Sequence, residues 1–505
     1  MSGTFSVTVQ EARGAVAVPA DLDNIAVVIG CSSAGSGLSP FFLNATAAIA
    51  NRGYGDAVDA LTQILEQRQS DGSSDVKVPA AMWTTPVDTT GAYGTIDTSG
   101  VTGTSVVTTD GAVDPFGTYE AKLIVVVGGT IGVTGITLRW SLDNGRTLSR
   151  VTALGTANNF TIPNSNVKFL FAAGTLVAGD EVFVRTFAPQ PAAADIDDAF
   201  VALANASANF TIVVLEFPIT AALAANVTTG LNELKSRGKR CVAICRTRLP
   251  DFEAAETEAA WGALIEANFI AFEDSRIVVR AAYGLITDAV TSRQYLRSTL
   301  AQLAADTVRV DRGVWPSAPA DRPEPNVTLV DADGVDVGHD EGPRGAFTGL
   351  SNDTLGNRFS CEQRLPDPQR LEDVFNTVPW VMYASDEQIR NLPTRRLANA
   401  IERVAASASI PSLGSKLFFV STGPSTGTLT DTSREAVHAT VYAAIKSEFG
   451  TEISNAEDAA IDNGLVQVNQ DIGVSGGNLL AISGNINPKI GGFVLSLDWT
   501  LSVQE

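Results

Sequence analysis

Signals for buried strands and for helices alternate in this sequence, and that alternation limits the fold more than any other feature. A continuous apolar run, NIAVVIGCSS from residue 24, is followed by the helical pattern YGDAVDALTQILEQ, in which Leu61, Ile64 and Leu65 share one face. Continuous apolar runs are typical of strands covered on both faces. Strands that alternate with helices form parallel sheets. The sequence therefore predicts an open α/β sheet.

The same rhythm returns after residue 191. The runs FTIVVLEF, KRCVAICRT and SRIVVRAAYG indicate strands, and the segments between them, TAALAANVTTGLNELKSRG and PDFEAAETEAAWGALIEANF, indicate helices. A chain of 505 residues is too long for one hydrophobic core. We expect a multidomain α/β protein in which residues 21–82 and 191–310 form one discontinuous α/β domain.

Residues 83–190 break the rhythm. They are rich in Thr, Gly and Val, and short strand patterns recur there between turn signals, including a hairpin turn at Asp143–Gly145. This pattern predicts an inserted all-β module that resembles a β-sandwich. Because an insertion leaves and re-enters its host domain at one place, we expect its ends, near Trp83 and Pro191, to lie close together.

Beyond residue 310 the chain is first rich in loops and then returns to α/β patterns. VPWVMYAS and SKLFFVST indicate strands, and RRLANAIERVAASAS and TSREAVHATVYAAIKSEFG indicate helices. Thr432 and Glu435 have the spacing of a capping box at the start of the last helix. We expect residues 311–469 to form a C-terminal α/β domain.

Both ends of the sequence alternate with period two, as a strand with one buried face does. The segment DIGVSGGNLLAISGNINPKIGG reads as a flexible link before the last strand. We expect residues 1–20 and 470–505 to be arms that add strands to a neighbouring copy. Folding back onto the chain's own domain is the alternative. The apolar residues of the two strands are Phe5, Val7, Val9, Phe493, Leu495, Leu497, Trp499, Leu501 and Val503.

Charge and motifs exclude several classes of function. The sequence has 35 Lys and Arg against 56 Asp and Glu, a net charge of −21, which argues against nucleic acid and anionic membrane as partners. No run of apolar residues is long enough to span a membrane. GCSSAGSG follows a buried strand but lacks the Lys of a phosphate loop and the spacing of a dinucleotide-binding turn. We therefore expect no cofactor.

Metal and catalytic signatures are weak as well. DADGVDVGHDE is acidic but does not have calcium-loop spacing, and a solvated loop is the simpler interpretation. Cys241 and Cys245 lack a second pair of ligands for zinc. His339 and His438 are the only histidines, and no catalytic motif surrounds them. We predict no metal and no enzyme, and keep an α/β enzyme and a carbohydrate-binding adhesin using Trp140 as alternatives.

The order of these features resembles the contractile tail sheath proteins of bacteriophages. The resemblance rests on VAVPADLDNIAVVIGCSSAG, on LRWSLDNGRTLS, on NRFSCEQRLPDPQRLEDVFNTVPWVMYASDEQIRNLPTRRLANAIERVAAS and on the closing GGFVLSLDWTLSVQE. It implies a structural subunit that forms stacked six-subunit rings around a tail tube and exchanges strands through its terminal arms. Contraction of the sheath would drive the tube through the host envelope.

The same resemblance implies where the protein works and what it meets. Its partners would be further copies, the tail tube protein, and the baseplate and tail terminator proteins. It would be made in the host bacterial cytoplasm and belong to the virion tail. The inserted module would face outward. The helix at 432–450, with Arg434 and Lys446, would be a candidate for contact with the tube.

Overall fold

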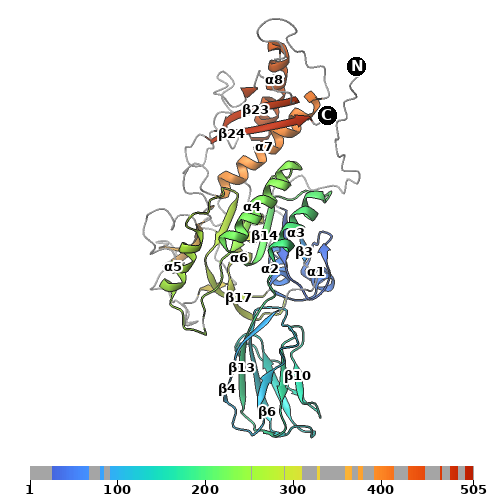
Figure 1. Cartoon of the computed structure of the whole chain (residues 1–505), viewed down its shortest axis with the longest axis vertical. Coiled ribbons are helices and arrows are strands. Elements are labelled where there is room, and N and C mark those ends of the chain that lie inside the picture. The colour runs from blue at the N-terminus through green and yellow to red at the C-terminus, as the bar shows by residue number, and fades with distance from the viewer. Residues whose placement is uncertain are drawn as a thin grey trace.

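The structure is a computed structural model of the whole chain, and it shows a mixed α/β protein with several sheets (Figure 1). The helices within the described residues are α1 Ala45–Arg52, α2 Asp56–Glu66, α3 Ala193–Asn205, α4 Ala221–Ser236, α5 Glu258–Phe269, α6 Leu300–Arg309, α7 Leu392–Leu413 and α8 Asp431–Phe449. The structure describes residues 25–66, 80–84, 91–251, 253–288, 290–309, 327–329, 359–366, 373–378, 381, 392–413, 430–449, 467–468, 478–486 and 495–503.

An eight-stranded sheet forms the middle of the molecule (Figure 1). Its six central strands run parallel, and β2 and β21 are antiparallel edges. The prediction of a parallel α/β sheet is confirmed. The strands, in spatial order, are β2 Gly37–Leu38, β3 Ala80–Thr84, β1 Ala26–Gly30, β14 Ile212–Pro218, β15 Val242–Arg246, β16 Ile277–Arg280, β20 Phe359–Pro366 and β21 Asp373–Val378.

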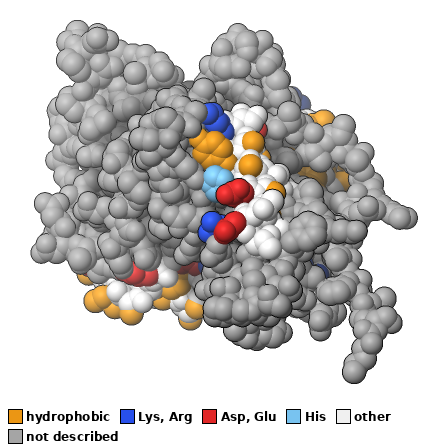
Figure 2. All heavy atoms as spheres, turned by 90° about the horizontal axis from the view of Figure 1, so that it is seen from above, with side chains coloured by type: hydrophobic (Ala, Val, Ile, Leu, Met, Phe, Trp, Pro, Cys, Tyr) orange, Lys and Arg blue, Asp and Glu red, His pale blue; other side chains and the backbone are white. Residues whose placement is uncertain are grey.

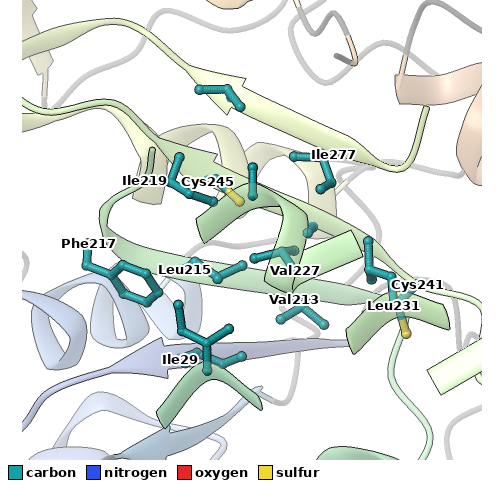
Figure 3. Packing of buried hydrophobic residues seen from close by; sticks show 14 of the residues in the cluster. Ile29, Val213, Leu215, Phe217, Ile219, Val227, Leu231, Cys241, Cys245 and Ile277 are labelled. Carbon is teal, nitrogen blue, oxygen red and sulfur yellow. The ribbon is translucent and has the colours of Figure 1, made fainter. Parts of the chain in front are cut away.

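Helices cover both faces of this sheet, which explains why its central strands are almost entirely apolar, with buried charged residues such as Glu216 and Arg246 near their carboxyl ends. In β1, Val27 and Ile29 pack toward the core under α3, α4 and α5, while Ala26 and Val28 pack toward the core under α2 and α6. Figure 3 shows the first core, where side chains of β14 meet those of α4. A strand buried on both faces is typically apolar at nearly every position.

Two helix starts differ from the predictions. Helix α5 begins at Glu258, not at Pro250, because the Asp251 carboxylate accepts the N–H groups of Glu253 and Ala254 and holds the preceding residues in a turn. Helix α8 begins at Asp431, and the Thr430 hydroxyl accepts the Ser433 N–H at 3.3 Å. The capping box predicted two residues later, at Thr432 and Glu435, is therefore wrong.

Residues 91–187, called the β-rich segment below, form strands joined by turns and loops and contain no helix. Its sheets have the orders β4-β13-β6-β8-β9, β10-β11-β5 and β12-β7. Ala92 pairs with Phe187, so the chain enters and leaves this segment side by side. The strands are β4 Ala92–Gly100, β5 Val107–Thr109, β6 Glu120–Val127, β7 Gly129–Thr130, β8 Thr137–Ser141, β9 Thr152–Ala153, β10 Asn159–Thr161, β11 Lys168–Phe171, β12 Thr175–Leu176 and β13 Glu181–Phe187.

The β-rich segment has a core of its own and lies at one end of the molecule (Figure 1). Leu123, Phe169 and Val184 are fully or almost fully buried in it. The predicted turn at Asp143–Gly145 is confirmed: Asn144 and Gly145 have φ of 57° and 86°, and the Arg146 N–H donates to the Asp143 carbonyl. Asn-Gly tolerates these positive φ angles better than most pairs.

Two small sheets complete the fold. The sheet β18-β17-β19 lies between the β-rich segment and the large sheet, and the sheet β22-β23-β24 lies near α7 and α8 at the other end (Figure 1). Glu402 of α7 is almost fully buried, and its Oε2 lies 2.7 Å from Nε of Arg240, which follows α4 in the chain. This ion pair joins the C-terminal end to the large sheet. The strands are β17 Tyr283–Thr287, β18 Gln294–Ser298, β19 Val327–Leu329, β22 Gln467–Val468, β23 Asn478–Ile486 and β24 Leu495–Val503.

Several expectations fall outside the described residues or are changed by the structure. The arm at 1–20, the acidic stretch at 331–341 and the strand SKLFFVST lie outside them, and VPWVMYAS is described only at Val378 and Val381. Strand β20 comes from beyond residue 310 yet pairs with β16, so the large sheet is not confined to the predicted discontinuous domain. The predicted flexible link contains β23.

Candidate functional sites at the sheet edge and the C-terminal sheet

The carboxyl edge of the large sheet is the place where an α/β fold of this order would bind a small ligand. The chain passes from β1 to β3 on one side and reaches β14 on the other, so the strand order reverses between β1 and β14. Ligands of open α/β sheets bind outside the strand ends at such a point. Here β1 ends at Gly30 and β14 reaches Glu216.

A buried ion network fills this edge. The Arg297 guanidinium lies 2.9 Å from the Asp56 carboxylate and also pairs with Asp59. It stacks on the ring of Tyr295, 4.3 Å from the ring centroid. Arg297 is 7% exposed and Asp56 is 5% exposed, so water screens the pair little. A buried ion pair of this kind holds two elements in one arrangement, provided that both partners are present.

The β-rich segment closes the edge from outside. The Thr118 N–H donates to Asp56 at 2.8 Å, and Arg297 donates to the Thr118 carbonyl at 3.3 Å. The Gln294 N–H donates to Asp143. Trp140, 9% exposed, lies in the core of the segment with the Arg293 guanidinium over its ring. Its ring is therefore not available to stack on a sugar, which removes the observation behind the adhesin hypothesis.

The space that remains at this edge is small. A cavity of about 20 Å³ is lined by Asp56, Asp59, Glu216, Asp288 and Arg297, among others. Ligand pockets are usually about 300–1,000 Å³, whereas roughly 10–15 Å³ holds one water. The cavity has room for about one water and none for a nucleotide or a sugar. The ion network occupies the place where a ligand would lie, and the β-rich segment contacts this network through Thr118.

Two carboxyl groups in the network have shifted pKa values. Burial raises the pKa of Glu216 to about 7, against the opposing effect of the Arg246 guanidinium. Burial also raises the pKa of Asp59 to about 7, although Arg297 acts in the opposite direction. Charged carboxylates lose hydration when buried, so the neutral acid is favoured. In both groups the neutral acid is therefore favoured up to a higher pH than in an exposed carboxyl group, and the effect is stronger for Glu216 because the Asp59 side chain is 25% exposed.

The C-terminal strand of the sequence prediction is present, but it has a partner in its own chain. Strand β24 pairs antiparallel with β23, with Leu501 opposite Leu480 and Trp499 opposite Ile482. Leu495, Leu497, Trp499, Leu501 and Val503 alternate along β24, and Phe493 lies outside the described residues. Within the described residues β24 is the last strand of its sheet, so its second edge faces no described strand.

Helix α8 carries the two residues that we considered for contact with a tube. Its buried stripe is Ser433, Val437, Val441, Ile445 and Phe449. Outside that stripe, Arg434 pairs with Asp431 at 3.4 Å, His438 stacks on Tyr442, and Lys446 lies over the Tyr442 ring. Figure 2 looks down on this end, where basic, acidic, histidine and hydrophobic side chains form one strip among undescribed atoms.

Sequence analysis missed the ion network. Asp56, Glu216 and Arg297 are far apart in the chain, and each reads in sequence as an ordinary surface charge. Each does interrupt or adjoin an apolar strand or helix, and a charged residue inside the run IVVLEFP was a signal of a buried partner. Nothing in the sequence indicated which cation that partner would be.

Within the described residues, no helix could cross a membrane and no cluster of His, Cys, Asp and Glu could hold a metal ion. Cys241 and Cys245 are free thiols. Burial raises the pKa of the Cys241 thiol to about 12, so this thiol stays protonated and is unsuited to bind metal.

No model of a known protein family matches this chain, and no curated protein matches it in sequence. A sheath tail protein from Desulfitobacterium hafniense has 10% identity and a TM-score of 0.47, over 95% of this chain and 96% of that chain. A sheath tail protein from Listeria innocua has 12% identity and a TM-score of 0.44, over 95% of each chain. A chain of the anti-feeding prophage baseplate has 11% identity and a TM-score of 0.36, over 63% of this chain and 73% of that chain. Among the solved structures similar to this chain are therefore two sheath tail proteins and a chain of the anti-feeding prophage baseplate.

Proposed function

We propose that this chain is the structural subunit of a contractile tail sheath. Copies would assemble into stacked six-subunit rings around a tail tube, and contraction would drive the tube through a host envelope. The sequence supports this proposal through the resemblance of its strand arms, β-rich segment and C-terminal region to sheath proteins. The closed sheet edge supports a structural role, because it leaves room for about one water.

The observation that carries the proposal is the edge position of β24. A nine-residue strand with alternating apolar residues ends its sheet within the described part of the chain. Long edge strands of this kind invite a further strand, and natural proteins normally shield them. We propose that a terminal arm of a neighbouring copy, including Phe5, Val7 and Val9, adds to this edge. Strand addition gives main-chain hydrogen bonds and side-chain pockets at once.

The remaining parts have proposed roles that follow from this arrangement. The β-rich segment, within the predicted module at 83–190, would face outward. The C-terminal elements, within 311–469, would form the inner layer. Partners would be further copies, the tube protein, and the baseplate and tail terminator proteins, in the tail of a virion.

Electron microscopy of the purified, concentrated full chain tests the proposal. The expected result is rods or stacked rings, formed by this chain alone. Single particles at every concentration, with no larger species in analytical ultracentrifugation, would contradict it.

Helix α8 provides a separate prediction on the tube. We expect the double variant Arg434→Glu, Lys446→Glu to weaken co-assembly with the purified tube protein by about tenfold, because each change reverses a charge on a partly exposed face. The measurement is the amount of tube protein that sediments with assembled sheath. Glu435→Gln, which changes a charge on an exposed residue of the same helix, is the matched control. Equal sedimentation by variant and wild type would remove α8 from the tube interface.

A further inference from the structure

A small cavity lies beside the joint between the β-rich segment and the large sheet, and its lining side chains carry more negative than positive charge. The β-rich segment does not line the cavity but contacts two of its residues, Asp56 and Arg297, through Thr118. Four carboxyl groups line the cavity, and the two guanidinium groups that pair with them cannot neutralise all four. With every group ionised, the cluster would carry two uncompensated negative charges. Buried charge without a partner is costly, so such a cluster must bind something positive. The carboxyl groups belong to Asp56, Asp59, Glu216 and Asp288, and the guanidinium groups to Arg246 and Arg297.

Glu216 is the least satisfied member of the cluster. Its Oε1 lies 2.9 Å from Nε of Arg246, but no described residue donates a hydrogen bond to its Oε2. Glu216 is 8% exposed and lines the cavity. Asp288, by comparison, accepts from Val290 and Thr291 within its own turn. The unpartnered oxygen of Glu216 is therefore the place where a positive species would bind.

The size and geometry of the site favour a proton over a metal ion. A hard cation such as Ca²⁺ needs six to eight oxygen ligands, and no group of three metal-ligating side chains within the described residues is placed to hold one. A proton needs a single oxygen. We propose that this cluster binds protons, with Glu216 as the main acceptor, and that proton loss loosens the β-rich segment from the sheet.

Loosening follows from the position of Asp56, which serves both sides of the joint. Asp56 accepts the Thr118 N–H of the β-rich segment and pairs with Arg297. An ionised Glu216 repels the Asp56 carboxylate across the cavity. It also competes with Asp56 for the positive charge of the Arg297 guanidinium. The titratable and charged groups that share the cavity with Glu216 or pair with it are Asp56 and Asp59 of α2, Arg246 of β15, Tyr295 and Arg297 of β18, and Asp288 after β17.

The sign of the pH dependence follows from the pKa of Glu216, which burial raises from 4.5 to about 7. When the joint opens to water, the pKa of Glu216 returns to its ordinary value. Opening therefore releases a proton from Glu216 between about pH 4.5 and about pH 7. The opening equilibrium constant therefore rises with pH through that window, by up to about tenfold per pH unit for each group, and levels off above it. The joint is tight in acid and loose at neutral pH.

Hydrogen–deuterium exchange of the full chain tests this inference, with rates corrected for intrinsic exchange. The amides of Thr118 and Gln294 report on the joint because they donate across it. We expect their opening constant in wild type to rise at least about tenfold between about pH 5 and about pH 7. Glu216→Gln should remove most of this rise. Glu233→Gln, at an exposed carboxyl group of α4, should keep the wild-type slope.

Three results would overturn the inference. The first is a wild-type opening constant that does not change with pH, and the second is the same slope in wild type and Glu216→Gln. The third is added Ca²⁺ or Na⁺ that protects the joint of wild type at neutral pH but not that of the variant, which would assign a cation site instead. If Glu216→Gln does not fold, Asp59→Asn is measured in the same way. None of these results depends on sheath assembly.

Discussion

Removal of residues 488–505 is expected to leave a folded chain that no longer assembles into rods or rings. The deleted residues include all of β24 but none of the strands or helices of the large sheet, whose cores are formed by other residues. If β24 supplies the edge to which a neighbouring copy adds its strand, its loss removes the contact directly. Loss of only about 3 kcal/mol per contact raises the concentration needed for assembly by more than about 100-fold.

Electron microscopy and sedimentation velocity measure this effect, and circular dichroism with a urea titration shows whether the truncated chain remains folded. Deletion of Gln504 and Glu505 alone is the matched control, because β24 ends at Val503. The control should assemble like the full chain. Normal tubes from the longer deletion would eliminate β24 as an assembly element, while the rest of the sheath proposal would still face its own test.

Replacement of Arg297 by Met should destabilise the joint more than any other single substitution that we consider. The variant leaves the buried Asp56 and the partly buried Asp59 without their cation, and it also removes the donor to the Thr118 carbonyl. Breaking a buried pair from one side costs about 3–5 kcal/mol. The measurement is the free energy of the unfolding transition that includes the β-rich segment. Hydrogen exchange at increasing urea concentrations gives this free energy.

A control and a rescue make this prediction specific. Arg237→Met removes an exposed pair with Glu233, in which both side chains are 44% exposed, and should cost less than about 1 kcal/mol. Adding Asp56→Asn and Asp59→Asn to Arg297→Met should recover part of the loss, because the unpaired charges disappear. A loss below about 1 kcal/mol for Arg297→Met would show that the network does not hold the joint.

Local pattern was sufficient to predict most of the large sheet. The runs around Val27, Val213 and Ile244 are almost entirely apolar because helices cover both faces, and these strands pair in parallel as predicted. Helix starts were less predictable. The first residue of α5 and of α8 depends on which of several nearby Thr and Asp side chains accepts a backbone N–H.

The C-terminal sheet shows where pattern reading failed. Gly and Asn in the segment before β24 suggested a flexible link, yet Leu480, Ile482 and Ile486 alternate and belong to β23. That alternation was visible in the sequence, but the pairing of β23 with β24 was not. Strand pairing depends on which edge is near, and an isolated alternating segment does not specify its partner.

The sequence by itself determined the α/β class, the main strands and helices, the turn at Asp143 and the alternating strand at 495–503, because each depends on residues close together in the chain. Only the tertiary structure decided that Arg297 joins Asp59 and Thr118, which lie 238 and 179 positions away, and that the β-rich segment closes the sheet edge. The physical reason is that burial and Coulomb energy depend on distance in space. A charge that looks solvated in the sequence becomes a structural element only when folding removes its water.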